Sequence, residues 1–227
     1  MVTRQKRLIT FVTIVAALAL WLPAEPGRAQ TRGAEPARII SLVPALTEML
    51  FDMGAGPQVV AVSRYDTFPR EVRALPKVGG LLDPDYEGIV RLAPDLVVTY
   101  GSQTELERRL TAGNIRVYSY RHSGIAGTLQ TMRELGTATG HEAGGRAAAG
   151  RLEARLDSVR MRVRGLSRPK TLLVFGREPG TLRQVYASGG GGFEHEVLEI
   201  AGGTNVFAST RRESVQPSIE MLLASAP

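Results

Sequence analysis

The stretch RIISLVPALTEMLFDMGAGPQVVAVS (residues 38–63) decides the fold, because its hydrophobic pattern changes twice along the chain. The short apolar run RIISL (residues 38–42) predicts a strand, and VVAVS (residues 59–63) predicts another. Between them apolar residues recur at helical spacing, at Leu46, Met49, Leu50 and Met53. Gly54 then stands where a helix ends. Strand, helix and strand in this order predict two parallel strands joined by a helical crossover.

The same order returns later in the chain. KTLLVF (residues 170–175) predicts a strand, FEHEVLEIAGG (residues 193–203) a helix, and NVFAS (residues 205–209) a second strand. DLVVTY (residues 95–100) is a continuous apolar run, as expected for a buried strand of a parallel sheet. We therefore predict an α/β protein with two Rossmann-like lobes, each built on a parallel sheet.

The segment between the two lobes predicts one long helix. Residues 141–164 are rich in Ala, Leu, Arg and Glu, and they would span about 36 Å at 1.5 Å per residue. Three glycines at 144, 145 and 150 oppose this, since each costs up to about 1 kcal/mol inside a helix. We predict an N-terminal lobe at 38–140, an interlobe helix at 141–166 and a partial C-terminal lobe at 167–227.

Two eleven-residue segments resemble each other, PDYEGIVRLAP (residues 84–94) and PSIEMLLASAP (residues 217–227), and they share Pro, Glu, Ala and a final Pro at matching positions. Both copies predict a helix with a proline in its first turn, where a missing N–H costs nothing, and with Glu87 or Glu220 about one turn in. The first copy leads directly into the strand DLVVTY. The second copy stops where its strand would begin, so we expect a truncated sequence with an incomplete second lobe.

The first 29 residues predict a secretory signal. Basic residues precede an apolar run at 8–22, and small residues precede a cleavage position after Ala29. We expect residues 30–37 to form a polar tether. An uncleaved membrane anchor is the alternative, but the run is shorter than the roughly 20 residues that a spanning helix needs. We expect an exported, periplasmic protein.

Composition excludes several classes of protein. The chain has 227 residues and no Cys, so it has no disulfide, no thiolate metal site and no lipid-anchoring cysteine. Half of the formal charge of +6 comes from residues 1–30, and the remainder is too small to indicate a nucleic-acid partner.

Taken together, the segments RIISLVPALTEMLFDMGAG, VVAVSRYDTFP and LPKVGGLLDPDYEGIVRLAPDLVV, with the long helix, resemble the helical-backbone (class III) periplasmic substrate-binding proteins of ABC importers. The resemblance covers residues 38–227 and is greatest to the cobalamin-binding members. It implies two lobes on a rigid helix, a chelate bound between them, and no enzymatic activity. It also implies a monomer that docks on an inner-membrane ABC permease dimer through one acid per lobe, which here are Glu87 and Glu220.

Ligand-binding residues are expected in the loops at the carboxyl ends of the strands. Tyr65 follows VVAVS, Tyr100 ends DLVVTY, and Tyr186 falls in the loop after KTLLVF. The resemblance places aromatic rings at these positions, where they would cover the apolar faces of a corrinoid. Further candidate ligand contacts are Arg64 and Asp66, which flank Tyr65, and Leu81.

The ligand itself stays open between cobalamin, haem and a ferric siderophore. The resemblance implies an axial tyrosine after KVG in haem binders and tryptophans in the cleft of cobalamin binders. Here KVGGLL has leucines at 81 and 82, Ser214 stands at a position expected for a ring, and the single tryptophan, Trp21, lies in the signal. A siderophore would find cations at Arg177, Arg211 and Arg212. No resident cofactor is expected, because the chelate is cargo.

Two other classes of function are less well supported by the sequence. A metal-ion binding protein needs converging ligands, whereas His122, His141 and His195 lack metal-ligand spacing. An exported hydrolase needs an activated nucleophile, but G-x-S-x-G and cysteine are both missing. The glycine run in SGGGGFEHE (residues 188–196) lacks the pattern of a phosphate-binding loop, so a flexible loop is expected there.

Overall fold

The computed structural model describes residues 35–225, so the predicted signal at 1–29 and most of the tether at 30–37 lie outside the described residues. All described elements belong to one compact unit that begins at Pro36. Within residues 35–225, no helix is long and apolar enough to cross a membrane.

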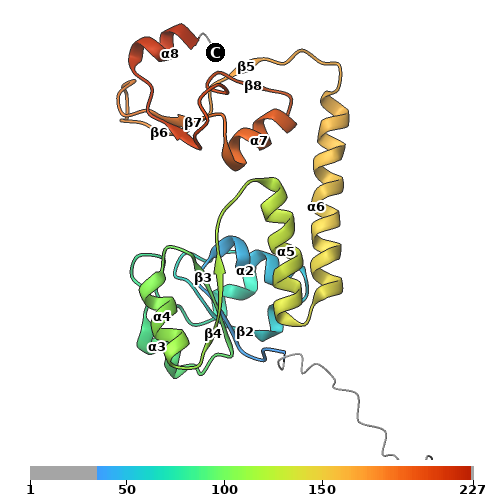
Figure 1. Ribbon diagram of the computed structural model, residues 1–227, viewed down its shortest axis with the longest axis vertical. Coiled ribbons are helices and arrows are strands. Elements are labelled where there is room, and N and C mark those ends of the chain that lie inside the picture. Colours follow the sequence, from blue (N-terminus) through green and yellow to red (C-terminus); the bar gives the residue numbers. More distant parts are fainter. Residues whose placement is uncertain (1–34, 226–227) are drawn as a thin grey trace, which may run out of the picture. The chain divides into compact units, whose positions relative to one another are not determined.

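The first lobe alternates strands and helices (Figure 1). In chain order it contains β1 (Ile39–Ser41), α2 (Pro44–Asp52), η2 (Gly56–Gln58), β2 (Val59–Val62), η3 (Arg70–Ala74), α3 (Tyr86–Arg91), β3 (Leu96–Tyr100), α4 (Thr104–Ala112), β4 (Arg116–Tyr120) and α5 (Ile125–Thr139).

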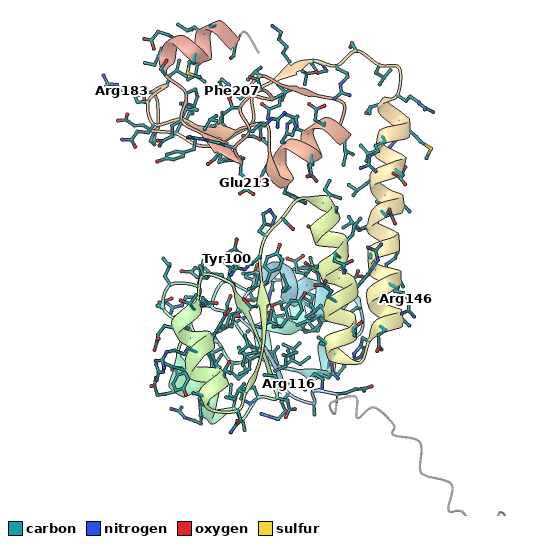
Figure 2. The ribbon with its side chains drawn as sticks, viewed as in Figure 1. Tyr100, Arg116, Arg146, Arg183, Phe207 and Glu213 are labelled. Atoms are coloured by element: carbon teal, nitrogen blue, oxygen red, sulfur yellow. The ribbon has the colours of Figure 1, made fainter. Side chains whose placement is uncertain are left out.

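Its four strands form one parallel sheet in the order β2-β1-β3-β4, which confirms the predicted crossover. The register of the β3–β4 pair runs from Leu96 opposite Arg116 to Tyr100 opposite Tyr120. Figure 2 shows Tyr100 and Arg116 at opposite ends of this sheet. Because all the strands point the same way, their carboxyl ends share one edge, the edge of Tyr100.

Alternate residues of the strands face two helical layers. Ile39 and Val98 pack in a cluster with α2, α5 and the long helix α6 (Glu142–Val163). Ile40 and Val97 pack in a second cluster with Ile89 of α3 and with leucines of α4. Both faces of the sheet are therefore covered, and this explains why the buried strands β2 and β3 are largely apolar runs rather than alternating ones.

The predicted long helix is confirmed, since α6 has 22 residues and packs beside α5 (Figure 1). Two of its glycines have a structural reason. A Cβ on Gly144 would overlap the carbonyl oxygen of Met53, and a Cβ on Gly145 would lie 3.0 Å from the Cα of Gly136 in α5. A Cβ on Gly150 would meet nothing within 4 Å. Close approach of α6 to the first lobe thus offsets part of the helix-propensity cost of the glycines.

The second lobe differs in detail from the predicted parallel sheet. Its elements are β5 (Lys170–Thr171), β6 (Val174–Gly176), β7 (Tyr186–Ser188), α7 (Gly192–Ile200), β8 (Thr204–Asn205), β9 (Ser214–Val215) and α8 (Ile219–Ser225). β5 pairs with β8 in parallel, but β6, β7 and β9 form an antiparallel sheet.

Two strand predictions in this lobe were therefore wrong in extent. KTLLVF is not one strand but two, β5 and β6, in different sheets. NVFAS is not a strand, because β8 ends at Asn205 and the chain then turns, with Ala208 N donating to Asn205 O at 3.0 Å. The helix predicted at 193–203 is confirmed as α7.

The repeated phrase forms a short helix in each lobe, α3 and α8, with Glu87 and Glu220 each as the second residue. The prolines were misplaced by the prediction. Pro84 lies before the N-cap residue Asp85, whose carboxylate accepts a hydrogen bond from Gly88 N at 2.9 Å, and Pro217 lies two residues before α8. Each proline therefore precedes its helix, and each glutamate lies in the first turn.

Candidate ligand-binding site

Three loops of the first lobe form one connected surface at the carboxyl edge of the sheet. They are the loop after β2 (residues 63–69), the loop at 79–83 and the loop after β3 (residues 101–103). Arg64 N donates to Gly79 O at 2.7 Å, which joins the first loop to the second. Gln103 is buried, and it accepts from Tyr100 N at 3.0 Å and donates to Leu81 O at 3.1 Å. The three loops are thus fixed relative to one another before any ligand arrives.

Tyr65 lies in the loop after β2 as predicted, and its side chain is 65% exposed. Its ring lies against Gly80, where an added Cβ would be 2.6 Å from Tyr65 Cε2. Glycine at this position therefore lets the ring come close to the neighbouring loop. Phe68, which precedes a cis proline, and Leu82 are also exposed on these loops, Leu82 to 93%. Such an exposed group of large apolar side chains on fixed loops is typical of a binding surface.

The charged candidates Arg64 and Asp66 both make contacts within these loops. Arg64 pairs with Asp83 at 2.8 Å, but both side chains are half-exposed, so the pair contributes little to stability. Asp66 is only 3% exposed and accepts a hydrogen bond from Ser63 Oγ at 2.5 Å. Lys77 Nζ donates to the backbone oxygen of Asp66 at 2.9 Å. Asp66 therefore faces the interior of its loop, whereas Arg64 and Leu81 reach the surface.

A row of aromatic rings continues from the ends of β3 and β4. Tyr100 meets Tyr120 edge to face with ring centroids 5.7 Å apart, Tyr120 meets His122 at 6.3 Å, and His122 meets Phe193 of α7 at 5.7 Å. Burial, followed by the neighbouring Tyr100, raises the pKa of Tyr120, so its phenol stays neutral. Tyr120, His122, Phe193 and Phe68 line one cavity of about 620 Å³. Its volume lies within the usual range for small-molecule sites.

Of these cavity residues, the sequence prediction named none as ligand contacts. Tyr120 and His122 follow the same rule that identified Tyr65, since they end and follow a strand of the parallel sheet. Phe68 lies within the segment SRYDTFP. Phe193 could not be found in this way, because its approach to His122 depends on the packing of α7.

Tyr186 is placed differently from the prediction. It does not lie in a loop but begins β7, where it pairs with Gly176 of β6, and its side chain is 48% exposed. Arg177, one of the cations considered for a siderophore, donates to Thr181 O at 3.0 Å within its own turn.

The two predicted docking acids both lie on the surface. The Glu87 side chain is 73% exposed, and its Oε1 lies 3.6 Å from Arg109 Nη2. The Arg109 guanidinium also lies 3.5 Å from the centroid of the Tyr86 ring. Glu220 is fully exposed, and hydrogen bonds from Ser218 and from the backbone lower the pKa of its carboxyl. Both acids are thus accessible to a partner.

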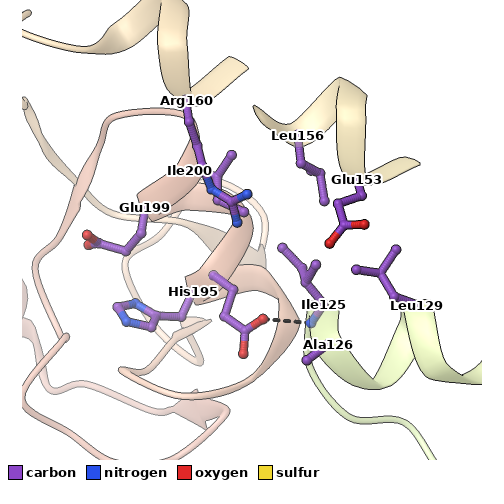
Figure 3. Close-up of a pocket in the computed structure, with 10 residues that line it drawn as sticks. Ile125, Ala126, Leu129, Glu153, Leu156, Arg160, His195, Glu199 and Ile200 are labelled. Carbon is purple, nitrogen blue, oxygen red and sulfur yellow. Dashed lines mark hydrogen bonds between the residues drawn. The ribbon is translucent and has the colours of Figure 1, made fainter. Parts of the chain in front are cut away.

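Another cavity, of about 470 Å³, lies where α5, α6 and α7 meet (Figure 3). Ile125 and Leu129 of α5 and Leu156 of α6 give it an apolar wall, and Arg160 and Glu153 extend toward it from α6. The dashed line in the figure marks the hydrogen bond of 2.6 Å from Ile125 N to Glu196 Oε2. In residues 35–225, no group of three or more His, Asp or Glu side chains is arranged to hold a metal ion.

Comparison with known proteins identifies the family. The family model described as periplasmic binding protein matches residues 39–227. The chain is a periplasmic binding protein. It is 31% identical over 218 residues to the vitamin B12-binding protein of Salmonella typhimurium, across 95% of this chain and 75% of that protein. Members of this family, including that relative, are substrate-binding proteins rather than enzymes. Membership of the family implies a periplasmic location.

Solved structures agree with the fold. The periplasmic vitamin B12 binding protein BtuF of Vibrio cholerae superposes with a TM-score of 0.70 at 24% identity, over 85% of this chain and 74% of that one. The periplasmic heme-binding protein RhuT of Roseiflexus sp. RS-1 gives 0.72 at 25% identity, over 84% and 73%. The predicted fold, two α/β lobes joined by a long helix, is thus confirmed.

Proposed function

We propose that this periplasmic binding protein captures a corrinoid at the carboxyl edge of the first lobe and delivers it to an ABC permease dimer. The observation that carries the proposal is the set of exposed rings on fixed loops, in a chain whose curated relatives are named as vitamin B12-binding proteins. The protein acts as a monomer after its predicted signal is removed, and the chelate is cargo rather than a resident cofactor.

The chemistry of the loops suits a large macrocycle. A corrinoid has broad apolar faces and a rim of amides, so it needs apolar area in the middle of the site and hydrogen-bonding groups around it. Tyr65, Phe68 and Leu82 offer the area, and the Tyr100 hydroxyl and Arg64 offer polar groups. Because Gln103 already fixes the loops, little conformational entropy is lost when the ligand is bound.

Haem is the second candidate, since a solved relative of similar fold is named as a heme-binding protein. At the position where the resemblance implies an axial tyrosine, this chain has Leu81, which is a side chain without a metal-binding atom. This favours the corrinoid over haem, and a ferric siderophore is the third ligand to compare.

A calorimetric titration with cyanocobalamin, haemin and a ferric siderophore tests the proposal. We expect cyanocobalamin to bind most tightly. Tyr65→Ala should weaken its binding by about 10-fold, since a stacked ring contributes on the order of 1 kcal/mol. Leu166→Ala is the matched control, because Leu166 is as exposed as Tyr65 but lies just after α6. Equal affinities of the two variants, or no binding of cyanocobalamin, would refute the proposed site.

Docking is proposed to use Glu87 and Glu220, one from each copy of the repeated helix. On docking, Glu87 would exchange its ion pair with Arg109 for an ion pair with an arginine of the permease. This exchange is feasible because a surface ion pair at 3.6 Å is weak. In liposomes that contain the permease, Glu87→Ala should abolish most uptake while cyanocobalamin binding persists. Glu71→Ala, an exposed acid on η3, is the control. Undiminished uptake by Glu87→Ala would show that this residue does not dock.

A further inference from the structure

His122 lies within the aromatic row formed by Tyr100, Tyr120, His122 and Phe193. It follows β4 by two residues and lines the 620 Å³ cavity together with Phe68, Tyr120 and Phe193. Its imidazole meets the rings of Tyr120 and Phe193, both edge to face. The ring is therefore held in a defined orientation although much of it is open to solvent.

Only one nitrogen of this imidazole has a partner among the described residues. His122 Nδ1 lies 2.9 Å from the Tyr120 hydroxyl, and either group can donate, depending on the tautomer. When Nδ1 carries the proton and donates to Tyr120 Oη, Nε2 has a free lone pair. Histidines that ligate metals in proteins have this arrangement, with one nitrogen fixed by a hydrogen bond and the other directed at the metal.

We propose that His122 donates its Nε2 lone pair as an axial ligand to the metal ion of a planar tetrapyrrole bound in the cavity. The proposal rests on the proposed function, since it needs a chelate as ligand. It covers Fe³⁺ in haem and Co³⁺ in a corrinoid whose axial position holds water. In the step, a metal–nitrogen bond forms, the metal–water bond breaks and the water leaves, so the oxidation state does not change.

The surroundings favour this role over that of an ordinary surface histidine. Phe193 and Phe68 give the cavity apolar area for a flat macrocycle, and its lining also includes the charged residues Glu48, Asp52, Arg151 and Arg155. Asp52 and Arg151 pair with each other at 2.8 Å. Tyr120 is itself buried, so its hydroxyl is held in place, and the partly buried hydrogen bond to Nδ1 positions the imidazole. His141 has a similar hydrogen bond, from Nδ1 to Thr139 O at 2.9 Å, but it lies at the α5–α6 turn and does not line this cavity.

Absorption spectroscopy tests the proposal with three probes. With haemin and with hydroxocobalamin, the wild-type protein should give the band shifts of an exchange of axial water for imidazole. His122→Ala should lose these shifts, and added free imidazole should restore them. Tyr120→Phe should keep the shifts but lower affinity for these probes by about 10-fold, as for loss of a partner of a metal ligand. His141→Ala is the control and should match the wild type.

Cyanocobalamin separates this proposal from the proposed function, because cyanide fills the axial position of its cobalt. His122→Ala should bind it almost as well as the wild type does. If cyanocobalamin binds but neither haemin nor hydroxocobalamin shows a shift that depends on His122, the axial role is refuted and the proposed function stands. If none of the three probes binds, both are refuted.

Discussion

Replacing Glu196 should loosen the start of α5. This helix has no side-chain cap of its own, because its N-cap residue is Gly124. Instead, Glu196 of α7 accepts a hydrogen bond from Ile125 N at 2.6 Å. A hydrogen bond to a charged group contributes about 1.5–3 kcal/mol, and its partial exposure reduces this here. We therefore expect Glu196→Ala to lower the free energy of unfolding by about 1–2 kcal/mol.

Gly124→Ala provides an independent route to the same bond. A Cβ on Gly124 would overlap Glu196 Oε1, so the carboxylate must move away and the hydrogen bond is lost. Because each substitution removes one and the same interaction, the double variant should be hardly less stable than Glu196→Ala alone.

These free energies can be measured by urea unfolding, with far-ultraviolet circular dichroism as the signal. Glu48→Ala is the control, an exposed acid on α2 whose loss should change stability by less than about 0.5 kcal/mol. If Glu196→Ala unfolds at the wild-type midpoint, or if the two single effects simply add, Glu196 does not cap α5.

Three further predictions concern the first lobe and the helix α6 that packs on it. Burial and the nearby Glu134 carboxylate raise the pKa of Tyr118 to about 12, whereas a tyrosine in the unfolded chain ionises near pH 10. The neutral phenol therefore contributes its full stability below about pH 10, and this contribution is lost as the pH rises toward 12. Tyr118→Phe should remove that loss, as measured by urea midpoints at about pH 9 and 11, and an unchanged loss would contradict the assignment. Gln103→Ala leaves partly buried loop groups unpaired and should cost about 1–3 kcal/mol in urea unfolding, more than an exposed control such as Gln130→Ala; equal costs would contradict its bridging role. Gly144→Ala should lower the melting temperature strongly, because its Cβ meets backbone of Met53, whereas Gly150→Ala should raise it slightly; the reverse order would contradict the packing.

Much of the first lobe could be predicted from the sequence, because the strands β1, β2 and β3 are buried on both faces and are therefore rich in apolar residues. The second lobe could not be predicted to the same extent. The run KTLLVF does not reveal that the chain changes sheets between Thr171 and Val174, since Leu172 and Leu173 continue the apolar run across the change. Tyr186 was assigned to a loop because the strand β7 has only three residues and leaves no clear hydrophobic pattern.

The candidate site was predictable where it depends on strand ends and not where it depends on tertiary packing. Tyr65 and Tyr100 follow from the rule that ligands gather at the carboxyl edge of a parallel sheet. The contact between His122 and Phe193 joins segments far apart in the chain, so no local pattern indicates it. By helix propensity alone, Gly144 appeared to destabilise the long helix. The structure shows that glycine is required there, because α6 approaches the backbone of Met53 closely.

The buried residues of α6 are Gly145, Ala148 and Ala149, and all three lie in the first half of the helix. Backbone amides of that half can exchange their hydrogens only if the contact with α5 opens as well. Those of the second half are limited mainly by fraying of the helix itself. Deuterium should therefore enter this one helix at two very different rates, slowly up to about residue 150 and rapidly toward Val163.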